Sequence, residues 1–306
     1  MRDDVVPAVR AVYGDQDLSS APAFGGGFIN FGHWEGISLD RPLTAEDRVR
    51  SQRDLYRCVL GALDGAGARG VEVGCGLGVG AVLAVEEFGF ASVTGLDIHP
   101  EQVERARRAN AGLLARAPER LGFACGAAER MPFGDGEFDR LYSVEAAQHF
   151  RDLAAFAREA ARVLRPGGRL AVTSFFVPAG AEGAGTEGAG AEGAGTEGAG
   201  TVDVGAVDVG AVDAVDVGAE LAARLDSFAS GLDVAHPVTS LTGALDAVGL
   251  SDVRVESIGG HVWPGLDHFL AGIDQPVRWP RNFLPAYRDG LLDYYVVTAR
   301  RPVEGG

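Results

Sequence analysis

The chain contains no lysine, and all 27 of its basic residues are arginine. Its 43 acidic residues give a formal net charge of −16. A surface with this excess of negative charge repels phosphate backbones, and no run of basic residues offsets it. We therefore expect neither DNA nor RNA as a partner. No apolar run reaches the ~18 residues that a membrane-spanning helix needs, so membrane insertion is not expected either.

Cysteine is scarce. The three cysteines, Cys58, Cys75 and Cys125, are scattered and odd in number, which argues against a disulfide framework and against a zinc site. We therefore expect no bound metal and a reducing, cytoplasmic environment. The first residues are acidic and include no apolar segment, so no signal peptide is expected.

One segment, residues 179–219, repeats a five-residue unit such as Gly-Ala-Glu-Gly-Ala and contains no basic residue. Its first half has no aromatic residue and no side chain larger than glutamate. Such a composition cannot bury enough apolar area to offset the entropy lost on ordering. We expect a disordered surface loop here.

Outside this repeat, apolar runs typical of buried strands alternate with segments whose apolar residues recur at helical spacing. Strands are expected at 69–73, 92–97, 121–125, 138–143, 169–176, 253–258 and 292–300. Helices are expected at 44–60, 79–88, 100–117, 152–164 and 239–248, with a turn at 165–168. This alternation predicts an α/β protein with a doubly wound, mostly parallel sheet of seven strands.

A glycine-rich stretch, residues 71–80, follows the first predicted strand and precedes a helix. Glycines let a backbone turn tightly and approach a ligand closely. The dinucleotide fingerprint Gly-x-Gly-x-x-Gly is not matched, because its third glycine is Val79 when counted from Gly74 and Ala81 when counted from Gly76. Asp97 ends the second strand, where a carboxylate can accept both hydroxyls of a ribose. The pattern predicts a nucleoside-containing cofactor.

Two more segments should reach the same carboxyl edge of the sheet, where ligands of open α/β folds bind. Residues 126–129, Gly-Ala-Ala-Glu, follow the third strand, and residues 144–149 follow the fourth. His149 is the candidate general base, because imidazole has an ordinary pKa close to neutral pH. A purely structural histidine is the alternative. The fifth strand carries no acid that could pair with His149.

Taken together, these residues resemble the class I S-adenosylmethionine-dependent methyltransferases, and within them the methyltransferase type 11-like enzymes. The resemblance covers roughly residues 65–177 and includes Phe138-Asp139 and the Leu-Arg-Pro-Gly-Gly run that ends at Gly168. It implies a Rossmann-like fold and S-adenosylmethionine as the cofactor. The cofactor-binding residues that it implies are Glu72, Gly74, Cys75, Gly76, Gly78, Asp97, Ile98, Ala128, Glu129, Val144 and Glu145.

The resemblance is nearer to small-molecule methyltransferases, including natural-product sugar O-methyltransferases and the tocopherol type. Those enzymes carry an N-terminal segment like Asn30–Trp34 and a lid between late strands; here the lid candidates are 221–237 and 262–287. These two lid segments contain many aromatic residues, which favours an apolar substrate pocket. The implied substrate contacts are Phe31, Trp34, Gln148, His236, Trp263 and Tyr287.

The chain is thus expected to divide into a helical N-terminal cap (1–64), a Rossmann-like cofactor-binding core (65–177), a low-complexity disordered insert (178–219) and a lid with the closing strands (220–306). The predicted reaction is methyl transfer to a small molecule, with a hydroxyl of a natural product or sugar as the acceptor. Nitrogen and carbon acceptors stay open. An NAD-dependent oxidoreductase and a non-catalytic cofactor-binding protein are the rival interpretations, and the oligomeric state is left open.

Overall fold

A computed structural model describes residues 7–14, 23–181, 216–273 and 281–303. Most of the predicted insert, residues 182–215, therefore lies outside the described residues. Among the helices that the structure describes, none has the length and apolar character to span a membrane.

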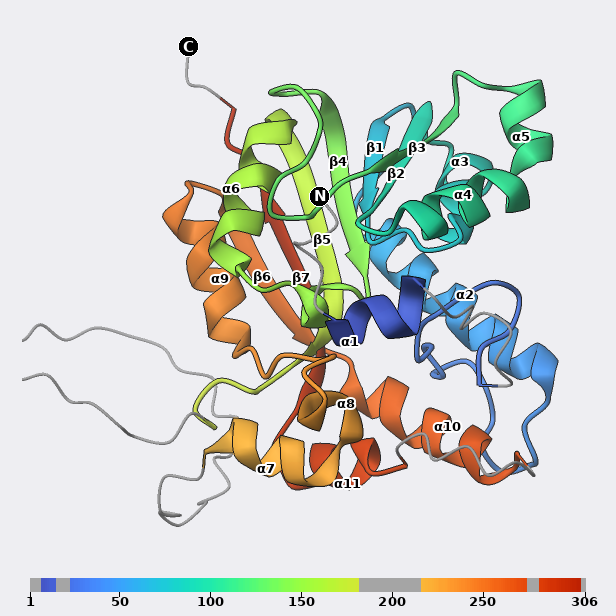
Figure 1. The fold of residues 1–306 in the computed structure, drawn as a ribbon, viewed down its shortest axis with the longest axis vertical. Coiled ribbons are helices and arrows are strands. Elements are labelled where there is room, and N and C mark those ends of the chain that lie inside the picture. The colour runs from blue at the N-terminus through green and yellow to red at the C-terminus, as the bar shows by residue number, and fades with distance from the viewer. Residues whose placement is uncertain (1–6, 15–22, 182–215, 274–280, 304–306) are drawn as a thin grey trace, which may run out of the picture.

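The centre of the fold is a seven-stranded sheet with the order β3-β2-β1-β4-β5-β7-β6 (Figure 1). Neighbouring strands are parallel except around β7, which runs antiparallel to both β5 and β6. The mostly parallel, Rossmann-like sheet predicted from the sequence is confirmed. The strands are β1 Arg69–Val73, β2 Ser92–Asp97, β3 Leu121–Cys125, β4 Phe138–Val144, β5 Leu164–Phe176, β6 Ser251–Ser257 and β7 Asp293–Arg300.

The turn predicted at residues 165–168 is wrong, because β5 already begins at Leu164, which pairs with Phe138 of β4. The register then shifts between Phe138 and Arg140, so the Arg-Pro-Gly-Gly run forms an irregularity within the strand. Gly167, with a φ of 81°, adopts a backbone conformation there that other residues rarely take.

Most helices begin and end close to their predicted bounds, and α2 begins with the capping box expected at Thr44 and Asp47. The predicted helix 100–117 is wrong in one respect: it is two helices, broken at Asn110. The Asn110 amide donates to the carbonyls of Leu77 (2.9 Å) and Ala106 (2.8 Å) and so competes with the helical backbone bonds. The core helices are α2 Ala45–Gly61, α3 Val79–Glu86, α4 Pro100–Ala109, α5 Ala111–Arg116, α6 Leu153–Val163 and α9 Val238–Ala247.

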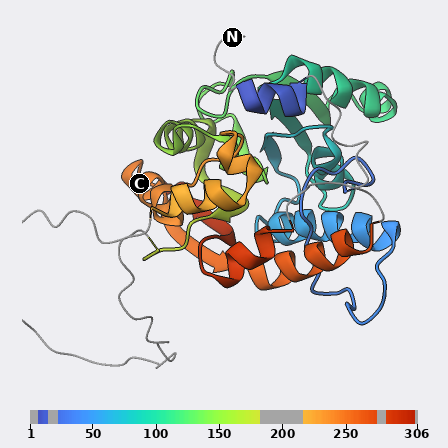
Figure 2. The same ribbon diagram turned by 60° about the horizontal axis from the view of Figure 1, so that its bottom comes forward.

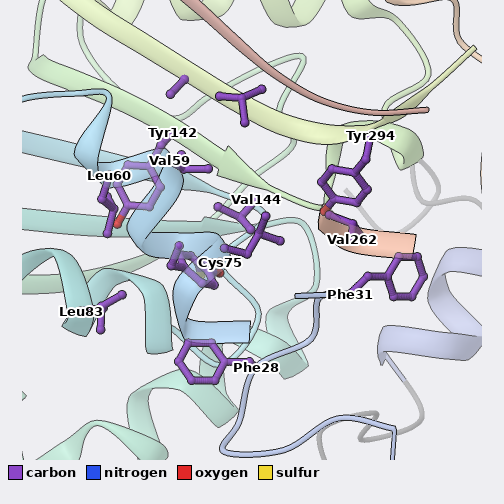
Figure 3. Packing of buried hydrophobic residues seen from close by; sticks show 14 of the residues in the cluster. Phe28, Phe31, Val59, Leu60, Cys75, Leu83, Tyr142, Val144, Val262 and Tyr294 are labelled. Carbon is purple, nitrogen blue, oxygen red and sulfur yellow. The ribbon is translucent and has the colours of Figure 1, made fainter. Parts of the chain in front are cut away.

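Helices cover both faces of the central strands, and successive strand residues point to opposite faces. On β4, Leu141 belongs to the apolar cluster under α6 and α9, whereas Tyr142 belongs to the cluster under α2 and α3. Both side chains are fully buried. Figure 3 shows part of the cluster under α2 and α3, in which Val59, Leu60 and Tyr142 pack together. The two cores thus pack helices against both faces of the sheet.

The remaining helices gather at that carboxyl edge. In Figure 1, β4 points toward the N-terminal helix α1 (Pro7–Val9), which continues as the π-helical turn η1 (Arg10–Gly14). The short 3-10 turn η3 (Ala147–His149) follows β4. Figure 2 brings the lid helices to the front, with α10 running beside α2. The lid comprises α7 Val217–Arg224, α8 Asp226–Ala229, α10 Gly259–Ala271 and α11 Phe283–Arg288.

The predicted insert is too long at its C-terminal end, because α7 already begins at Val217. The side chain of Asp216 accepts a hydrogen bond from the Ala219 backbone and caps this helix. Residues 217–219 are therefore helical rather than disordered, and the lid starts earlier than expected.

Replacing residues 182–215 by a short Gly/Ser linker, with Asp216 retained, should change the free energy of unfolding by less than ~1–2 kcal/mol. The reason is compositional: the segment offers too little apolar area to stabilise the fold. Urea unfolding of both proteins measures the difference. A Gly/Ser segment of the original length is the control for loop-closure entropy. A larger loss in both variants would show that the native segment packs against the fold.

Candidate active site

A cavity of about 340 Å³ opens at the carboxyl edge of β1, β2 and β4, beneath the N-terminal helix. Nine of the eleven predicted cofactor-binding residues line it: Gly74, Cys75, Gly76, Asp97, Ile98, Ala128, Glu129, Val144 and Glu145. The other two, Glu72 and Gly78, do not. Residues from four separate segments thus meet where the sequence predicted.

The glycine loop follows β1 and turns sharply, with positive φ angles of 77°, 51° and 71° at Gly74, Gly76 and Gly78. A side chain on Gly74 would come within 2.4 Å of Ala146, and one on Gly78 within 2.4 Å of the Phe123 ring. Gly78 therefore serves the packing of the loop against β3 rather than the cavity. Around Gly76 there is open space, which leaves the backbone accessible to a ligand.

Asp97, the last residue of β2, lines the cavity directly beside the glycine loop. One carboxylate oxygen accepts a hydrogen bond from the Gly76 backbone (3.0 Å) and the other accepts from the His99 backbone (2.9 Å). Burial raises the pKa of Asp97 to about 6, although these two backbone donors act in the opposite direction. The backbone groups of Gly76 and His99 thus hold the carboxylate in place, and it lines the cavity.

Glu72 lies within β1 and does not line the cavity. It is fully buried, and one of its oxygens accepts a hydrogen bond of 2.8 Å from the Tyr56 hydroxyl. Burial is the main cause that raises the pKa of Glu72 to about 8. Glu72 is therefore a neutral, buried carboxyl that connects β1 to Tyr56 of α2.

The buried Glu72 should make the protein less stable as the pH rises. The unfolded carboxyl loses its proton near the ordinary value of 4.5, whereas the folded one keeps it until about pH 8. The unfolding free energy should therefore fall between these two values, by up to a few kcal/mol from this group. In Glu72→Gln the decrease should be smaller, as denaturant titrations at pH 5 and pH 8 would show. The exposed Glu86→Gln is the control, and equal pH dependence in both variants would contradict the assignment.

Glu145 connects the cavity to the N-terminal segment. It has a φ of 53°, unusual for a residue other than glycine, and one carboxylate oxygen accepts from both the Phe31 backbone (2.7 Å) and the Tyr294 hydroxyl (2.6 Å). Burial raises the pKa of Glu145 to about 8. Figure 3 shows Phe31 and Tyr294 converging with Val262 of α10. This carboxyl thus joins β4, β7 and the segment before α2.

A second cavity of about 270 Å³ adjoins the first, and the lining residues Tyr13, Ile29, Glu145 and His149 belong to both. It lies between the segment before α2, the end of β5 and the lid helices α8 and α11. Its remaining lining residues are Phe24, Phe31, Gln148, Phe175, Asp226, Ser227, Ser230, Leu232, Asp233 and Phe283.

Two of the six predicted substrate residues, Phe31 and Gln148, line this second cavity, and the other four line neither cavity. Trp263 is buried behind the wall and stacks on Phe283 at 5.0 Å. Trp34 is buried, and its indole donates to the Phe31 carbonyl. His236 bonds the Phe150 carbonyl at 2.6 Å, and Tyr287 lies against Gly259. Trp34 and Trp263 thus contact the lining residues Phe31 and Phe283 without reaching the cavity themselves.

His149 sits on the border between the two cavities, and its hydrogen bonds define its tautomer. The amide nitrogen of Gln148 lies 3.2 Å from Nε2, and the same nitrogen donates to the Glu145 carbonyl (2.9 Å). Because an amide nitrogen is only a donor, Nε2 must be the acceptor. Nδ1 then carries the hydrogen and faces the Leu232 carbonyl (2.9 Å) and the Asp233 carboxylate (3.2 Å). The lone pair on Nε2 thus faces the Gln148 amide and the hydroxyl of Tyr13, which lies 3.0 Å away and, like His149, lines both cavities.

Two residues of this arrangement were missed by the sequence analysis. Asp233, from the lid loop after α8, supplies the acid that the fifth strand lacks, and no local pattern marks it. Tyr13 places its hydroxyl 3.0 Å from Nε2 of His149. Val9 and Tyr13, four residues apart, both line the first cavity, and this helical spacing could have indicated the N-terminal helix.

One group of described residues could hold a metal ion, although none was expected from the sequence. The ligand atoms of His33, Glu35 and His261 lie within 4.8 Å of one another. The Trp34 backbone donates to the His261 carbonyl at 2.7 Å and brings the two segments together. None of the three lines either cavity.

Comparison with known proteins gives matches to methyltransferases. Residues 71–172 match a family described as a methyltransferase domain. The chain is 36% identical to 2-methyl-6-phytyl-1,4-hydroquinone methyltransferase of Synechocystis sp. over 154 residues, 49% of this chain and 45% of that protein. It is 36% identical to fatty-acid O-methyltransferase of Mycolicibacterium smegmatis over 144 residues, 46% of this chain and 50% of that protein. The match thus spans about half the length of these curated relatives.

A solved structure extends the likeness over nearly the whole chain. Geranyl diphosphate C-methyltransferase from Streptomyces coelicolor, in complex with Mg²⁺, geranyl diphosphate and S-adenosyl-L-homocysteine, superposes with a TM-score of 0.70. The superposition covers 97% of this chain and 98% of that chain at 17% identity. At this identity the likeness shows the fold, which here includes the N-terminal and lid additions.

Proposed function

Because the chain carries a class I S-adenosylmethionine-dependent methyltransferase domain, we propose that it transfers the methyl group of S-adenosylmethionine to a hydroxyl of a small molecule. The observation that carries this proposal is the pair of adjoining cavities with His149 on their border. One cavity has the cofactor residues and the other has an apolar wall. The imidazole Nε2 lies 3.0 Å from the Tyr13 hydroxyl, and both residues line both cavities.

The residues of the first cavity fit the cofactor. Asp97 would hold the ribose hydroxyls, Glu129 and the Ala128 backbone would meet the adenine, and the open backbone at Gly76 would face the methionine part. When bound, S-adenosylmethionine would supply an electrophilic methyl group, carried on its sulfonium sulfur, to the acceptor oxygen. The remainder of the cofactor would be S-adenosylhomocysteine. The chain then has to position the acceptor and remove one proton.

His149 can accept that proton. Its Nε2 is the unprotonated nitrogen, so it can take the hydrogen of an acceptor hydroxyl as the oxygen is methylated. Asp233 and the Leu232 carbonyl hold the hydrogen on Nδ1 and fix the ring, and the nearby carboxylate stabilises the imidazolium that forms. Asp233 acts through His149 and is therefore a positioning residue.

Transfer of a labelled methyl group tests this function. The protein is incubated with S-adenosylmethionine labelled with ¹³C in the methyl group and with a set of alcohols and phenols, and the products are followed by carbon–proton correlation spectra. A methoxy signal that depends on the protein is the expected result. Label found only in nitrogen- or carbon-bound methyl groups would refute the hydroxyl acceptor, and label that never leaves the cofactor would refute the reaction.

A further inference from the structure

We propose that the second cavity binds the acceptor, and that this acceptor is an uncharged alcohol or phenol on an apolar body. The inference rests on the proposed methyltransferase function and names the substrate class of the same site. The walls, the charges and the position of one tyrosine hydroxyl each support it.

The walls of the second cavity are aromatic and mutually supported. The Phe31 ring stacks on Phe175 (6.0 Å between centroids) and packs against Phe283 (5.2 Å). Phe283 in turn stacks on the fully buried Trp263. Because these rings already hold one another in place, an apolar ligand can bury its surface against them without reorganising the wall.

The charges around the cavity are negative. Its described lining includes the carboxylates of Asp226 and Asp233 and no arginine, and the third acid, Glu145, is mostly neutral because burial raises its pKa to about 8. Arg48, a buried cation that bonds the backbone of the lining residue Phe31, donates to the carbonyls of Ala23, Asn30 and Phe31.

A phosphate, diphosphate or carboxylate on the acceptor would therefore meet repulsion and no free cationic partner among the described lining residues. An uncharged acceptor avoids this cost. The acidic lining thus selects against anionic acceptors while the rings favour an apolar one.

The hydroxyl of Tyr13 shows where an acceptor hydroxyl could meet His149. The phenolic oxygen of Tyr13 lies 3.0 Å from Nε2 of His149, and the two rings are 5.2 Å apart. Burial, followed by the nearby Asp233, raises the pKa of this phenol well above its ordinary value, so Tyr13 is a neutral donor. An acceptor hydroxyl that displaces the Tyr13 oxygen from this position would direct its proton to the same nitrogen.

A matched pair of ligands tests the charge requirement. Calorimetry first measures the binding of S-adenosylhomocysteine, and then 1-naphthol and 1-naphthyl phosphate are each titrated into the saturated complex. The naphthol should bind at least ~10-fold more tightly than its phosphate ester. Equal or tighter binding of the phosphate overturns the inference. If S-adenosylhomocysteine binds and neither naphthyl compound does, the inference also fails, whereas absence of S-adenosylhomocysteine binding refutes the cofactor assignment instead.

A substitution in the lining sharpens the test. Asp226→Arg introduces a cation at the edge of the second cavity and should raise the affinity for 1-naphthyl phosphate about 10-fold. Asp246→Arg is the matched control, because it makes the same change of net charge at an exposed position of α9 that lines neither cavity. An equal effect of the two substitutions would show that overall charge, and not the second cavity, decides the binding of the phosphate.

Discussion

Asp97→Ala should weaken the binding of S-adenosylmethionine by about 2–3 kcal/mol, or roughly 30- to 150-fold. The carboxylate lines the cavity beside the glycine loop, and both of its oxygens are held by backbone donors. In the complex it would accept the two ribose hydroxyls, and alanine offers no acceptor in its place. Calorimetric titration of both proteins measures the loss.

Glu101→Ala is the control for Asp97→Ala, because it removes a nearby carboxylate that does not line the cavity. Glu101 lies in the first turn of α4 and does not line the cavity, so Glu101→Ala should leave the affinity within about twofold. An Asp97→Ala protein that binds as tightly as the parent would show that this carboxylate does not hold the ribose. A parallel loss in the Glu101 variant would point to long-range charge instead.

His149→Ala should lower kcat for a hydroxyl acceptor by about 10²- to 10⁴-fold, the range expected for a positioned general base. Affinity for the cofactor should change little, because the imidazole nitrogen faces the border between the cavities rather than the glycine loop. Steady-state kinetics together with cofactor titration separate the two quantities.

Two further variants test whether His149 is the general base. Asp233→Asn should lower kcat by a smaller factor, since the Leu232 carbonyl still holds Nδ1. His268→Ala, at a half-buried position of α10 that lines neither cavity, should leave kcat unchanged. If His149→Ala lost stability but not rate, the imidazole would be a structural residue, and an unchanged variant would remove it from the mechanism.

The sheet could be predicted because its signals are local. Buried apolar runs mark the five core strands, and the glycine loop and Asp97 lie at strand ends, where topology alone brings them together. Errors arose where a single side chain or pairing overrides the pattern, as at Asn110, which breaks a helix, and at Leu164, where strand pairing begins inside the expected turn.

The acceptor side could be predicted only in part, because its contacts join distant segments. His149 meets Tyr13 from the N-terminal helix and Asp233 from the lid, separated from it by 136 and 84 positions. Composition identified the lid as aromatic but could not separate lining residues from supporting ones. Trp263 and Phe283 stack on each other, yet only Phe283 reaches the cavity.

The central claim is that the cavity at the carboxyl edge of β1, β2 and β4 is an S-adenosylmethionine site. Calorimetric titration of the whole chain with S-adenosylmethionine, and separately with NAD, tests it most directly. We predict saturable binding of one S-adenosylmethionine per chain, competition by S-adenosylhomocysteine, and no saturation by NAD in the same concentration range. Saturation by NAD without binding of S-adenosylmethionine would contradict the claim.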